Sequence, residues 1–229
     1  MNTPFPIIYE DNHLLAVIKP AGLATMGVPA NKPSLLVLAK QYIKTVHSKP
    51  GNVYLGTVSR LDAPVTGIVL FARTSKAAAR LTEQFRSREV DKTYWAILSR
   101  APEPSAGTWT DWVVKDERHR RMHVVGQEKP GAQHAELSYR CLSSGKNKQL
   151  VEIDLKTGRK HQIRLQFGSR GYPILGDRKY GGNIDDFSPG IALHAHRLAF
   201  QHPVRNERIE LVAPTGRAWK RQGLPLDEG

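Results

Sequence analysis

Short apolar runs that end at glycine or proline recur along this chain of 229 residues. The run "LLAVI" at 14–18 is followed by "KPAG", "GIVLFAR" occupies 67–73, and "KTYWAIL" occupies 92–98. Runs of this length, rich in β-branched and aromatic residues and bounded by turn residues, indicate buried strands. The chain must therefore build much of its core from strands.

Two segments show helical spacing instead. Ser34 is placed to cap a helix over 35–46, and Thr74 or Ser75 can cap a second helix that ends near Arg88. Both segments repeat apolar residues at intervals of three and four, which predicts one buried face on each helix.

The second half of the chain alternates apolar and polar residues. Alternation over 151–155 and again over 163–167, on either side of the turn "KTGR", predicts a hairpin in which Arg164 points away from the face of its apolar neighbours. The runs "HAHRLAF" and "RIELVAP" add further strands. Many strands and few helices predict an α+β fold, with a central mixed or mostly antiparallel sheet flanked by helices and loops.

The length allows one domain or two. We expect a single domain over 1–229, or two subdomains. The stretch at 99–108, rich in proline, glycine and serine, is interpreted as a surface loop or as the boundary between the two halves.

The charge balance indicates the partner. Lysine and arginine number 34 against 21 acidic residues, a formal net charge of +13. A field of this size attracts polyanions, so nucleic acid is the leading partner, with a merely solvated basic surface as the alternative. A membrane surface is disfavoured, because the basic residues are not gathered on one amphipathic helix.

Compartment and redox chemistry follow from two further features. The chain has neither a run of about 18 apolar residues nor an apolar signal core at its start, so we expect a cytoplasmic protein. Its one cysteine, Cys141, excludes an internal disulfide and a multi-cysteine zinc site.

One acid stands out in the stretch "TVSRLDAPVTG". Asp62 lies between Arg60 and a proline-containing turn, just ahead of the predicted strand at 67–73. Cationic neighbours keep such a carboxylate ionised and oriented, which suits a nucleophile or general base. The alternative is an aspartate that only satisfies turn backbone groups.

The stretch from 156 to 182 is the most basic part of the chain. It contains seven lysines and arginines against one acid, Asp177, and six glycines that allow close approach of the backbone to a ligand. This composition suits contacts to a phosphate backbone. The stretch lacks the P-loop pattern, so no nucleotide cofactor is implied.

Tyr94 offers two interpretations. In a strand it is expected in the core, but its ring could stack on an extruded base while its hydroxyl moves a proton. The nine histidines show no spacing with carboxylates or cysteines that suggests a metal, and Asp185 and Asp186 fit a solvated loop. We therefore expect no metal site.

Five motifs in order resemble the RluA family of RNA pseudouridine synthases. "SRLDAPVTGIVLFART" resembles the family's catalytic motif, usually "HRLDxxTSGLLLFAKT", and "GRKHQIRLQFGSRGYPILGDRKYGG" resembles its second long motif. "IIYEDNHLLAVIKPAGL", "DKTYWAIL" and "LHAHRLAF" also match in the expected order. The resemblance runs from about residue 7 to residue 214 and implies the fold of a pseudouridine synthase catalytic domain, without an S4 domain ahead of it.

The resemblance also implies roles for particular residues. Asp62 matches the catalytic aspartate, Arg60 the arginine associated with the flipped-out nucleotide, Tyr94 the active-site tyrosine, and Arg164 the arginine that pairs with the aspartate. Leu165 matches an apolar position of the uracil pocket. In the same motif we assign four neighbouring residues to substrate binding: Arg159, Lys160, His161 and Gln162.

These roles predict an isomerase that converts specific uridines of a structured tRNA or rRNA to pseudouridine and acts as a monomer without a cofactor. A non-catalytic RNA-binding protein or chaperone that keeps the fold is the alternative. A metal-dependent nuclease would require clustered carboxylates, which the sequence does not supply. Ser59 stands where the family often has histidine, and "APVTG" replaces "xxTSG", so the local turn and the substrate choice are expected to differ.

Overall fold

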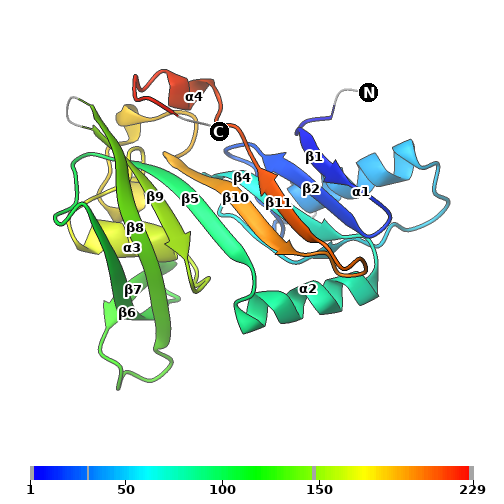
Figure 1. Cartoon of the computed structure of the whole chain (residues 1–229), viewed down its shortest axis with the longest axis horizontal. Coiled ribbons are helices and arrows are strands. Elements are labelled where there is room, and N and C mark those ends of the chain that lie inside the picture. Colours follow the sequence, from blue (N-terminus) through cyan, green and yellow to red (C-terminus); the bar gives the residue numbers. More distant parts are fainter. Residues whose placement is uncertain (1–2, 30, 146–147, 227–229) are drawn as a thin grey trace. The chain divides into compact units, whose positions relative to one another are not determined.

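The computed structural model describes residues 3–29, 31–145 and 148–226, which form two compact units (Figure 1). Unit 1 comprises residues up to Val90 together with Arg197–Ala213. Unit 2 comprises Asp91–His196 and the segment that begins at Pro214. The first change of unit thus falls at Val90, ahead of the proline-rich stretch expected as a boundary.

Unit 1 contains strands from both ends of the chain. Its central order is β1-β2-β4, β3 pairs with β4, and β10 pairs with β11, all antiparallel. The strands are β1 (Ile7–Glu10), β2 (Leu14–Lys19), β3 (Gly56–Thr57), β4 (Thr66–Ala72), β10 (Leu193–Gln201, of which Arg197 onward belongs to this unit) and β11 (Arg208–Val212).

Two helices enclose unit 1 and begin at the residues that the sequence predicts. Helix α1 (Leu35–Val46) is capped by the Ser34 side chain, which accepts from the backbone N–H of Val37. Helix α2 (Ser75–Ser87) is capped by Thr74, which accepts from the N–H of Ala77. Each cap satisfies a backbone donor that the first turn of the helix leaves free, which fixes where the helix starts.

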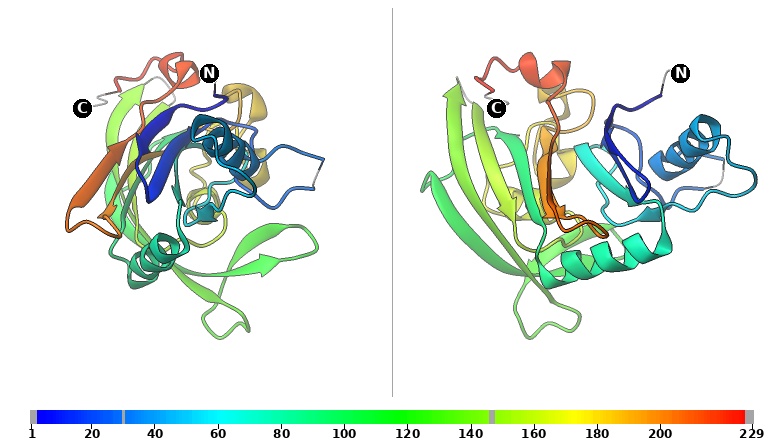
Figure 2. Two further views of the ribbon diagram at one scale, coloured as in Figure 1. Left: turned by 90° about the vertical axis from the view of Figure 1, so that its right-hand side faces the viewer. Right: turned by 45° about the vertical axis from the view of Figure 1, so that its right-hand side comes forward.

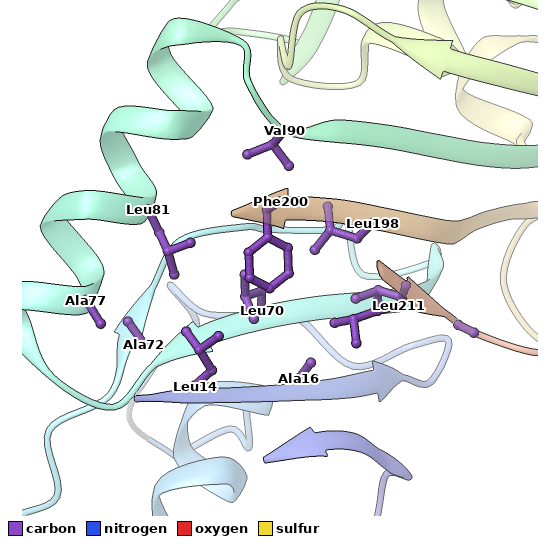
Figure 3. Packing of buried hydrophobic residues seen from close by; sticks show 12 residues of the cluster. Leu14, Ala16, Leu70, Ala72, Ala77, Leu81, Val90, Leu198, Phe200 and Leu211 are labelled. Atoms are coloured by element: carbon purple, nitrogen blue, oxygen red, sulfur yellow. The ribbon is translucent and has the colours of Figure 1, made fainter. Parts of the chain in front are cut away.

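The alternating residues of β2 and β4 divide between two cores, because successive side chains of a strand face opposite sides. One face packs against α2 and the β10–β11 hairpin, with Phe200 among the strand residues (Figure 3). The other face packs against α1 through residues such as Leu15 and Phe71. A strand pair buried on both sides gives the nearly continuous apolar run seen at 67–73, and it forms a stiff base for the loop ahead of β4.

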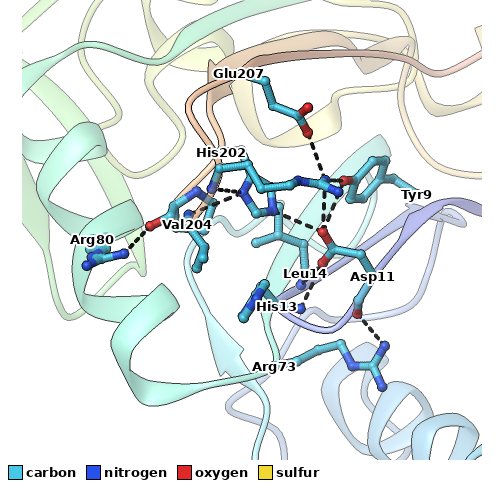
Figure 4. A network of polar contacts seen from close by, with 11 residues as sticks. Tyr9, Asp11, His13, Leu14, Arg73, Arg80, His202, Val204 and Glu207 are labelled. Carbon is cyan, nitrogen blue, oxygen red and sulfur yellow. Dashed lines mark hydrogen bonds and ion pairs between the residues drawn. The ribbon is translucent and has the colours of Figure 1, made fainter.

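A polar network ties the β1–β2 turn to the loop between β10 and β11 (Figure 4). Asp11 accepts hydrogen bonds from the backbone of His13 and Leu14 and contacts Nε2 of His202 over 2.9 Å. The other ring nitrogen of His202 accepts from the backbone N–H of Arg205. These bonds assign the ring proton to Nε2 and hold two hairpins of unit 1 together.

Unit 2 is built on an antiparallel order β5-β9-β8-β6-β7 (Figures 1 and 2). Its strands are β5 (Asp91–Leu98), β6 (Ala106–Asp116), β7 (Arg121–Val125), β8 (Gln133–Gly145) and β9 (Lys148–Leu155). The remaining elements are α3 (Gln162–Ser169), the 3₁₀ helices η1 (Arg178–Tyr180) and η2 (Ile184–Asp186), and α4 (Arg217–Lys220).

The hairpin predicted for 151–167 is wrong in its second half. Residues 151–155 do lie in β9, but 162–169 form α3 and not a strand. All side chains from Gln162 to Phe167 are buried, so the helix has no solvent face to reveal a period of 3.6. Its polar residues fall at every second position by coincidence, and each is satisfied inside the fold. The inference that Arg164 points across a sheet fails with the strand.

Helix α3 packs against β6, β7, β8 and η1. Leu165 and Tyr180 share a small core with Val113, Met122 and Ala135. Gly168 makes this packing possible, because a Cβ at that position would lie 2.6 Å from the carbonyl oxygen of Tyr180. The segments 162–169 and 178–180 are therefore held as one block on the strands of unit 2.

The other strand predictions are confirmed within one or two residues, as is the α+β class. Within the described ranges, no helix is both long enough and apolar enough to cross a membrane.

Candidate active site

Asp62 lies in a loop of unit 1 whose backbone is hydrogen-bonded to side chains of the segment 19–25. The hydroxyl of Thr25 donates to the carbonyl of Leu61 over 2.9 Å and accepts from the N–H of the same residue over 3.1 Å. On the other side of Asp62, the ammonium of Lys19 donates to the carbonyl of Ala63 over 3.0 Å. The backbone on both sides of the acid is thereby held in place.

Lys19 is fully buried, although it carries a charge in its ordinary state. Besides Ala63, its ammonium donates to the carbonyls of Pro20 and Leu23, each over 2.8 Å. Burial lowers the pKa of Lys19 from its ordinary 10.5 to about 8, and the negative charge of Asp62 acts in the opposite direction. Asp62 therefore lies in the field of a buried cation.

The turn after Asp62 leads directly into β4. The N–H of Val65 donates to the carbonyl of Asp62 over 3.0 Å, which closes the turn that contains Pro64. Gly67 follows with φ 113, a backbone conformation that side-chain-bearing residues rarely adopt. The loop and the buried strand are thus one rigid piece.

Ser59 and Arg60 precede the acid in the same loop. The Ser59 hydroxyl accepts from the N–H of Leu70 over 2.9 Å, next to the end of the short β3–β4 pairing. The serine that replaces the family's usual histidine therefore fastens the loop to β4. Arg60 is exposed, so its guanidinium is accessible to a large polyanion.

In unit 2, Arg164 is nearly buried and forms a bidentate ion pair. Its Nε and Nη2 donate to the two carboxylate oxygens of Asp177 over 2.7 and 2.8 Å, and its guanidinium lies 5.3 Å from the ring centre of Tyr180. Bidentate pairs of this kind fix the plane of the guanidinium. Asp177 and Tyr180 thus orient Arg164.

The four residues at 159–162, which we assign to substrate binding, have different environments. Arg159 donates from Nε to the carbonyl of His134, Lys160 is exposed, and Nδ1 of His161 lies 2.9 Å from the Tyr180 hydroxyl. The side-chain amide of Gln162 accepts from Thr157 and Arg159 and donates to Glu136 and Gln166. All four hydrogen-bonding positions of that amide are used inside the protein, so Gln162 shapes the turn ahead of α3.

Tyr94 and Leu165 lie on different elements of unit 2. Tyr94 is half-buried in β5 and lies opposite Ile153 of β9, whereas its neighbours along the strand, Thr93 and Trp95, are buried. Leu165 is 5% exposed in the core between α3 and the strands. The structure thus places Arg60 and Asp62 in one loop of unit 1, and it brings His161, Arg164 and Leu165 against Asp177 or Tyr180 in unit 2.

The described residues contain no group of three or more histidine, cysteine, aspartate or glutamate side chains that could hold a metal ion. The candidate residues of the two units carry carboxylate, guanidinium, ammonium, imidazole and phenol groups.

Comparisons with known proteins place this set of residues in a family. The model of the RNA pseudouridylate synthase family matches residues 13–169, which include Lys19, Arg60, Asp62, Tyr94 and Arg164. This chain is a member of the RluA family of RNA pseudouridine synthases, which are isomerases. The family and the enzyme class expected from the motifs are thereby confirmed.

Similar proteins of this family cover most of the chain. An uncharacterized RNA pseudouridine synthase of Synechocystis is 35% identical over 93% of this chain, which spans 66% of that relative's length. The dual-specificity RNA pseudouridine synthase RluA of Pasteurella multocida is 32% identical over 91% of this chain and 92% of its own. The solved structure of human RNA pseudouridylate synthase domain containing 4 has a TM-score of 0.78 and 29% identity, and the match covers 96% of this chain and 94% of that one.

Sequence reasoning missed the residues that hold this synthase-family loop and helix in place. Lys19 was visible in the "KPAG" motif and Asp177 as the one acid of a basic stretch, but neither spacing nor charge reveals their hydrogen bonds. Thr25 and Tyr180 carried no signal that distinguishes them from ordinary turn and core residues.

Proposed function

We propose that this protein isomerises one or more uridines of a structured tRNA or rRNA to pseudouridine, with Asp62 as the nucleophile and the target base flipped out of its stack. The observation that carries the proposal is the fixation of the Asp62 loop by Lys19 and Thr25. A carboxylate that only closed a turn would not need a buried ammonium bonded to the backbone of the next residue.

The reaction requires little beyond a positioned carboxylate. The bond from N1 of uracil to the sugar breaks, a bond from C5 to the same sugar carbon forms, and the proton lost from C5 is balanced by one gained at N1. No redox change and no energy input occur, so we propose that the protein uses neither a metal nor an organic cofactor. Asp62 would form and then release a covalent bond to the nucleoside, as an enzyme carboxylate can.

The other residues take supporting roles in this proposal. Tyr94 would handle a proton, Arg164 would hold the aspartate ionised, and Arg60 would contact the flipped-out nucleotide. Leu165 would line the uracil pocket, and the segment 159–162 would bind the substrate, with Gln162 acting through the turn ahead of α3 because its amide is already fully hydrogen-bonded. The family motifs support these assignments. We further propose that the protein acts as a monomer in the cytoplasm.

The substrate class follows from charge and from the relatives. The formal charge of +13 suits a phosphate backbone. One relative, from Xylella fastidiosa, is a ribosomal large subunit pseudouridine synthase, which supports rRNA as a candidate substrate. A flipped uridine in a loop is the usual way in which a folded RNA presents a base to an enzyme.

The test is a pseudouridine-specific chemical map of total RNA from cells with and without the gene, complemented by wild type or by Asp62→Ala. We expect one or a few sites to disappear without the gene and to return only with wild type. Purified Asp62→Asn should bind RNA within about threefold of wild type but show no turnover, because the change removes the nucleophile and little charge. Turnover by the variant would refute the role of Asp62.

The alternative function is RNA binding without catalysis. It predicts that no modified site depends on the gene, although RNA binding by the purified protein is easily measured.

A further inference from the structure

The β6–β7 hairpin of unit 2 presents a set of exposed cations. Arg118 and Arg120 lie in its turn, and Arg121 begins β7. Both arginines of the turn are exposed. Within the ranges that the structure describes, the guanidinium groups of Arg118 and Arg120 have no hydrogen-bond or ion-pair partner. Unpaired charges at the end of a hairpin are available for an external anion.

A second segment adds to the same surface. The ammonium of Lys179 in η1 donates to the carbonyl of Arg120 over 3.1 Å, and the Arg121 guanidinium donates to the carbonyl of Lys179. Arg178, the neighbour of Lys179, is exposed. Two parts of the chain that are distant in sequence thus meet in one patch, the basic hairpin surface, which consists of Arg118, Arg120, Arg121, Arg178 and Lys179.

This surface is held in a fixed shape. Asp116 closes the hairpin turn, because its carboxylate accepts from the backbone N–H of His119 over 3.0 Å and contacts the ring Nδ1 of the same residue over 2.7 Å. Tyr180 accepts from the N–H of Met122 over 3.0 Å, and the Arg121 guanidinium lies 5.3 Å from its ring centre. Charges on a preorganised frame lose less entropy when they bind a ligand.

The acids on the hairpin do not cancel this charge. Glu117 pairs with Lys115 over 2.5 Å, and Asp116 is engaged by His119 and, over 3.5 Å, by His123. The local excess of positive charge therefore remains with the five residues of the basic hairpin surface.

The surface is linked to the second family motif. The Tyr180 hydroxyl, which fastens the hairpin, also lies 2.9 Å from Nδ1 of His161. Lys160, beside His161, is exposed. The basic hairpin surface and the segment 159–162 are thus joined through one phenol.

We propose that the basic hairpin surface binds the sugar–phosphate backbone of the RNA substrate at nucleotides away from the reacting uridine. This inference rests on the proposed function, from which it takes the substrate class. Unpaired guanidinium groups on a fixed frame suit phosphates, and each neutralised phosphate adds salt-dependent affinity. An anionic membrane is the weaker candidate, because a membrane-binding surface also needs exposed apolar side chains. Met122 of the hairpin is buried, which leaves Val124 as an exposed large apolar residue there.

The test compares two triple variants that lose the same charge. Arg118→Gln/Arg120→Asn/Arg178→Gln removes three charges from the basic hairpin surface, with asparagine at Arg120 because its φ of 49 is one that asparagine tolerates. The control, Lys76→Gln/Arg86→Gln/Arg88→Asn, removes three exposed charges in and just after α2 of unit 1, and Arg88 has a φ of 64. Dissociation constants are measured by fluorescence anisotropy with labelled unfractionated tRNA and a labelled rRNA stem–loop between about 50 and 300 mM KCl.

We expect the hairpin variant to bind at least about tenfold more weakly at about 100 mM salt. The slope of log Kd against log salt should fall by about two, because about two fewer phosphates are neutralised. The control should lose less than about threefold. A charge-preserving variant with lysine at Arg118, Arg120 and Arg178 should retain most of the affinity, which also guards against misfolding. Equal losses in the two glutamine and asparagine variants, or no loss in either, would overturn the proposal. Loss of binding to phosphatidylserine vesicles without loss of RNA binding would assign the surface to a membrane instead.

The two proposals fail separately. RNA affinity that depends on the basic hairpin surface, together with no pseudouridine formation by wild type, would leave the RNA-binding role intact and refute the isomerase. Pseudouridine formation by a hairpin variant with unchanged Kd and KM would refute the RNA-binding role of the basic hairpin surface and leave the isomerase intact.

Discussion

Arg164 and Asp177 form a buried bidentate ion pair in unit 2, with side chains that are 7% and 2% exposed. The pair spans α3 and the segment just ahead of η1, and the Tyr180 ring lies beside the same guanidinium. The orientation of Arg164 is therefore set by the protein before any substrate arrives. A residue assigned to hold a catalytic carboxylate ionised needs this kind of support.

Replacing Asp177 should disturb both stability and turnover. In Asp177→Asn the buried guanidinium loses its countercharge, which costs about 3 kcal/mol in the free energy of unfolding. We expect kcat to fall at least about tenfold, because Arg164 loses its fixed plane. Urea unfolding and single-turnover kinetics measure the two effects. Asp186→Asn, the same change at an exposed position in η2, should alter neither. An equal effect there would show that the loss in Asp177→Asn does not act through the orientation of Arg164.

Lys19 should act on the reaction through the backbone around Asp62. Lys19→Met keeps an unbranched side chain one atom shorter but leaves the carbonyls of Pro20, Leu23 and Ala63 without their donor. Each buried carbonyl left without a donor costs up to about 1 to 3 kcal/mol in the free energy of unfolding, and relaxation of the loop reduces that cost. We expect a lower free energy of unfolding and a kcat reduced more than KM is raised.

The matched control for this lysine is Lys49→Met, an exposed residue in the loop after α1. It should leave the free energy of unfolding within about 0.5 kcal/mol of wild type. If Lys19→Met were as stable and as active as this control, the fixation of the Asp62 loop by the ammonium would be unimportant.

The departure at Ser59 should be measurable as a loss of stability. In Ser59→Ala the N–H of Leu70 loses the hydroxyl that accepts its hydrogen bond, next to the β3–β4 pairing. We expect a cost of about 1 kcal/mol, measured by urea unfolding. Ser59→Thr, which keeps the hydroxyl, should recover most of that loss, whereas equal losses in the two variants would indicate a packing effect.

The sequence was sufficient where one physical signal dominated. The Ser34 and Thr74 caps place the starts of α1 and α2, because a hydroxyl ahead of an amphipathic run has one favourable use. The continuous apolar run of β4 reflects a strand buried on both faces. The family motifs single out Asp62 and Arg60 by residue type and order, which no single spacing could have done, and the roles of these two residues stay predictions.

The sequence failed where tertiary contacts reversed the local pattern. Polar residues at 162, 164 and 166 mimic a strand, but Gln162 and Gln166 are satisfied by neighbours and Arg164 by Asp177. A period-2 pattern cannot be distinguished from a wholly buried helix when its polar members find partners inside the protein. The supporting roles of Lys19 and Tyr180 were hidden for the same reason, since their partners are backbone groups or distant residues.

The polar network around Asp11 should make unit 1 sensitive to acid. Burial alone would raise the pKa of the Asp11 carboxyl, but hydrogen bonds from the backbone of His13 and Leu14 and from the side chains of His202 and Tyr9 hold it below its ordinary value of 3.8. A carboxyl with a lowered folded-state pKa contributes stability that is fully present above the unfolded pKa and is lost as pH falls through the folded one.

The prediction is tested by urea unfolding of wild type and Asp11→Asn from about pH 6 to about pH 2.5. At pH 6 we expect wild type to be more stable by about 2 kcal/mol, because the ionised carboxylate accepts several hydrogen bonds that an amide cannot all replace. The difference should shrink below about pH 4, as the wild-type carboxylate takes up its proton. Asp185→Asn removes an exposed carboxylate and should show no such pH-dependent difference. A gap between wild type and Asp11→Asn that stayed constant down to pH 2.5 would mean that the network stabilises unit 1 by packing, and not through the charge of Asp11.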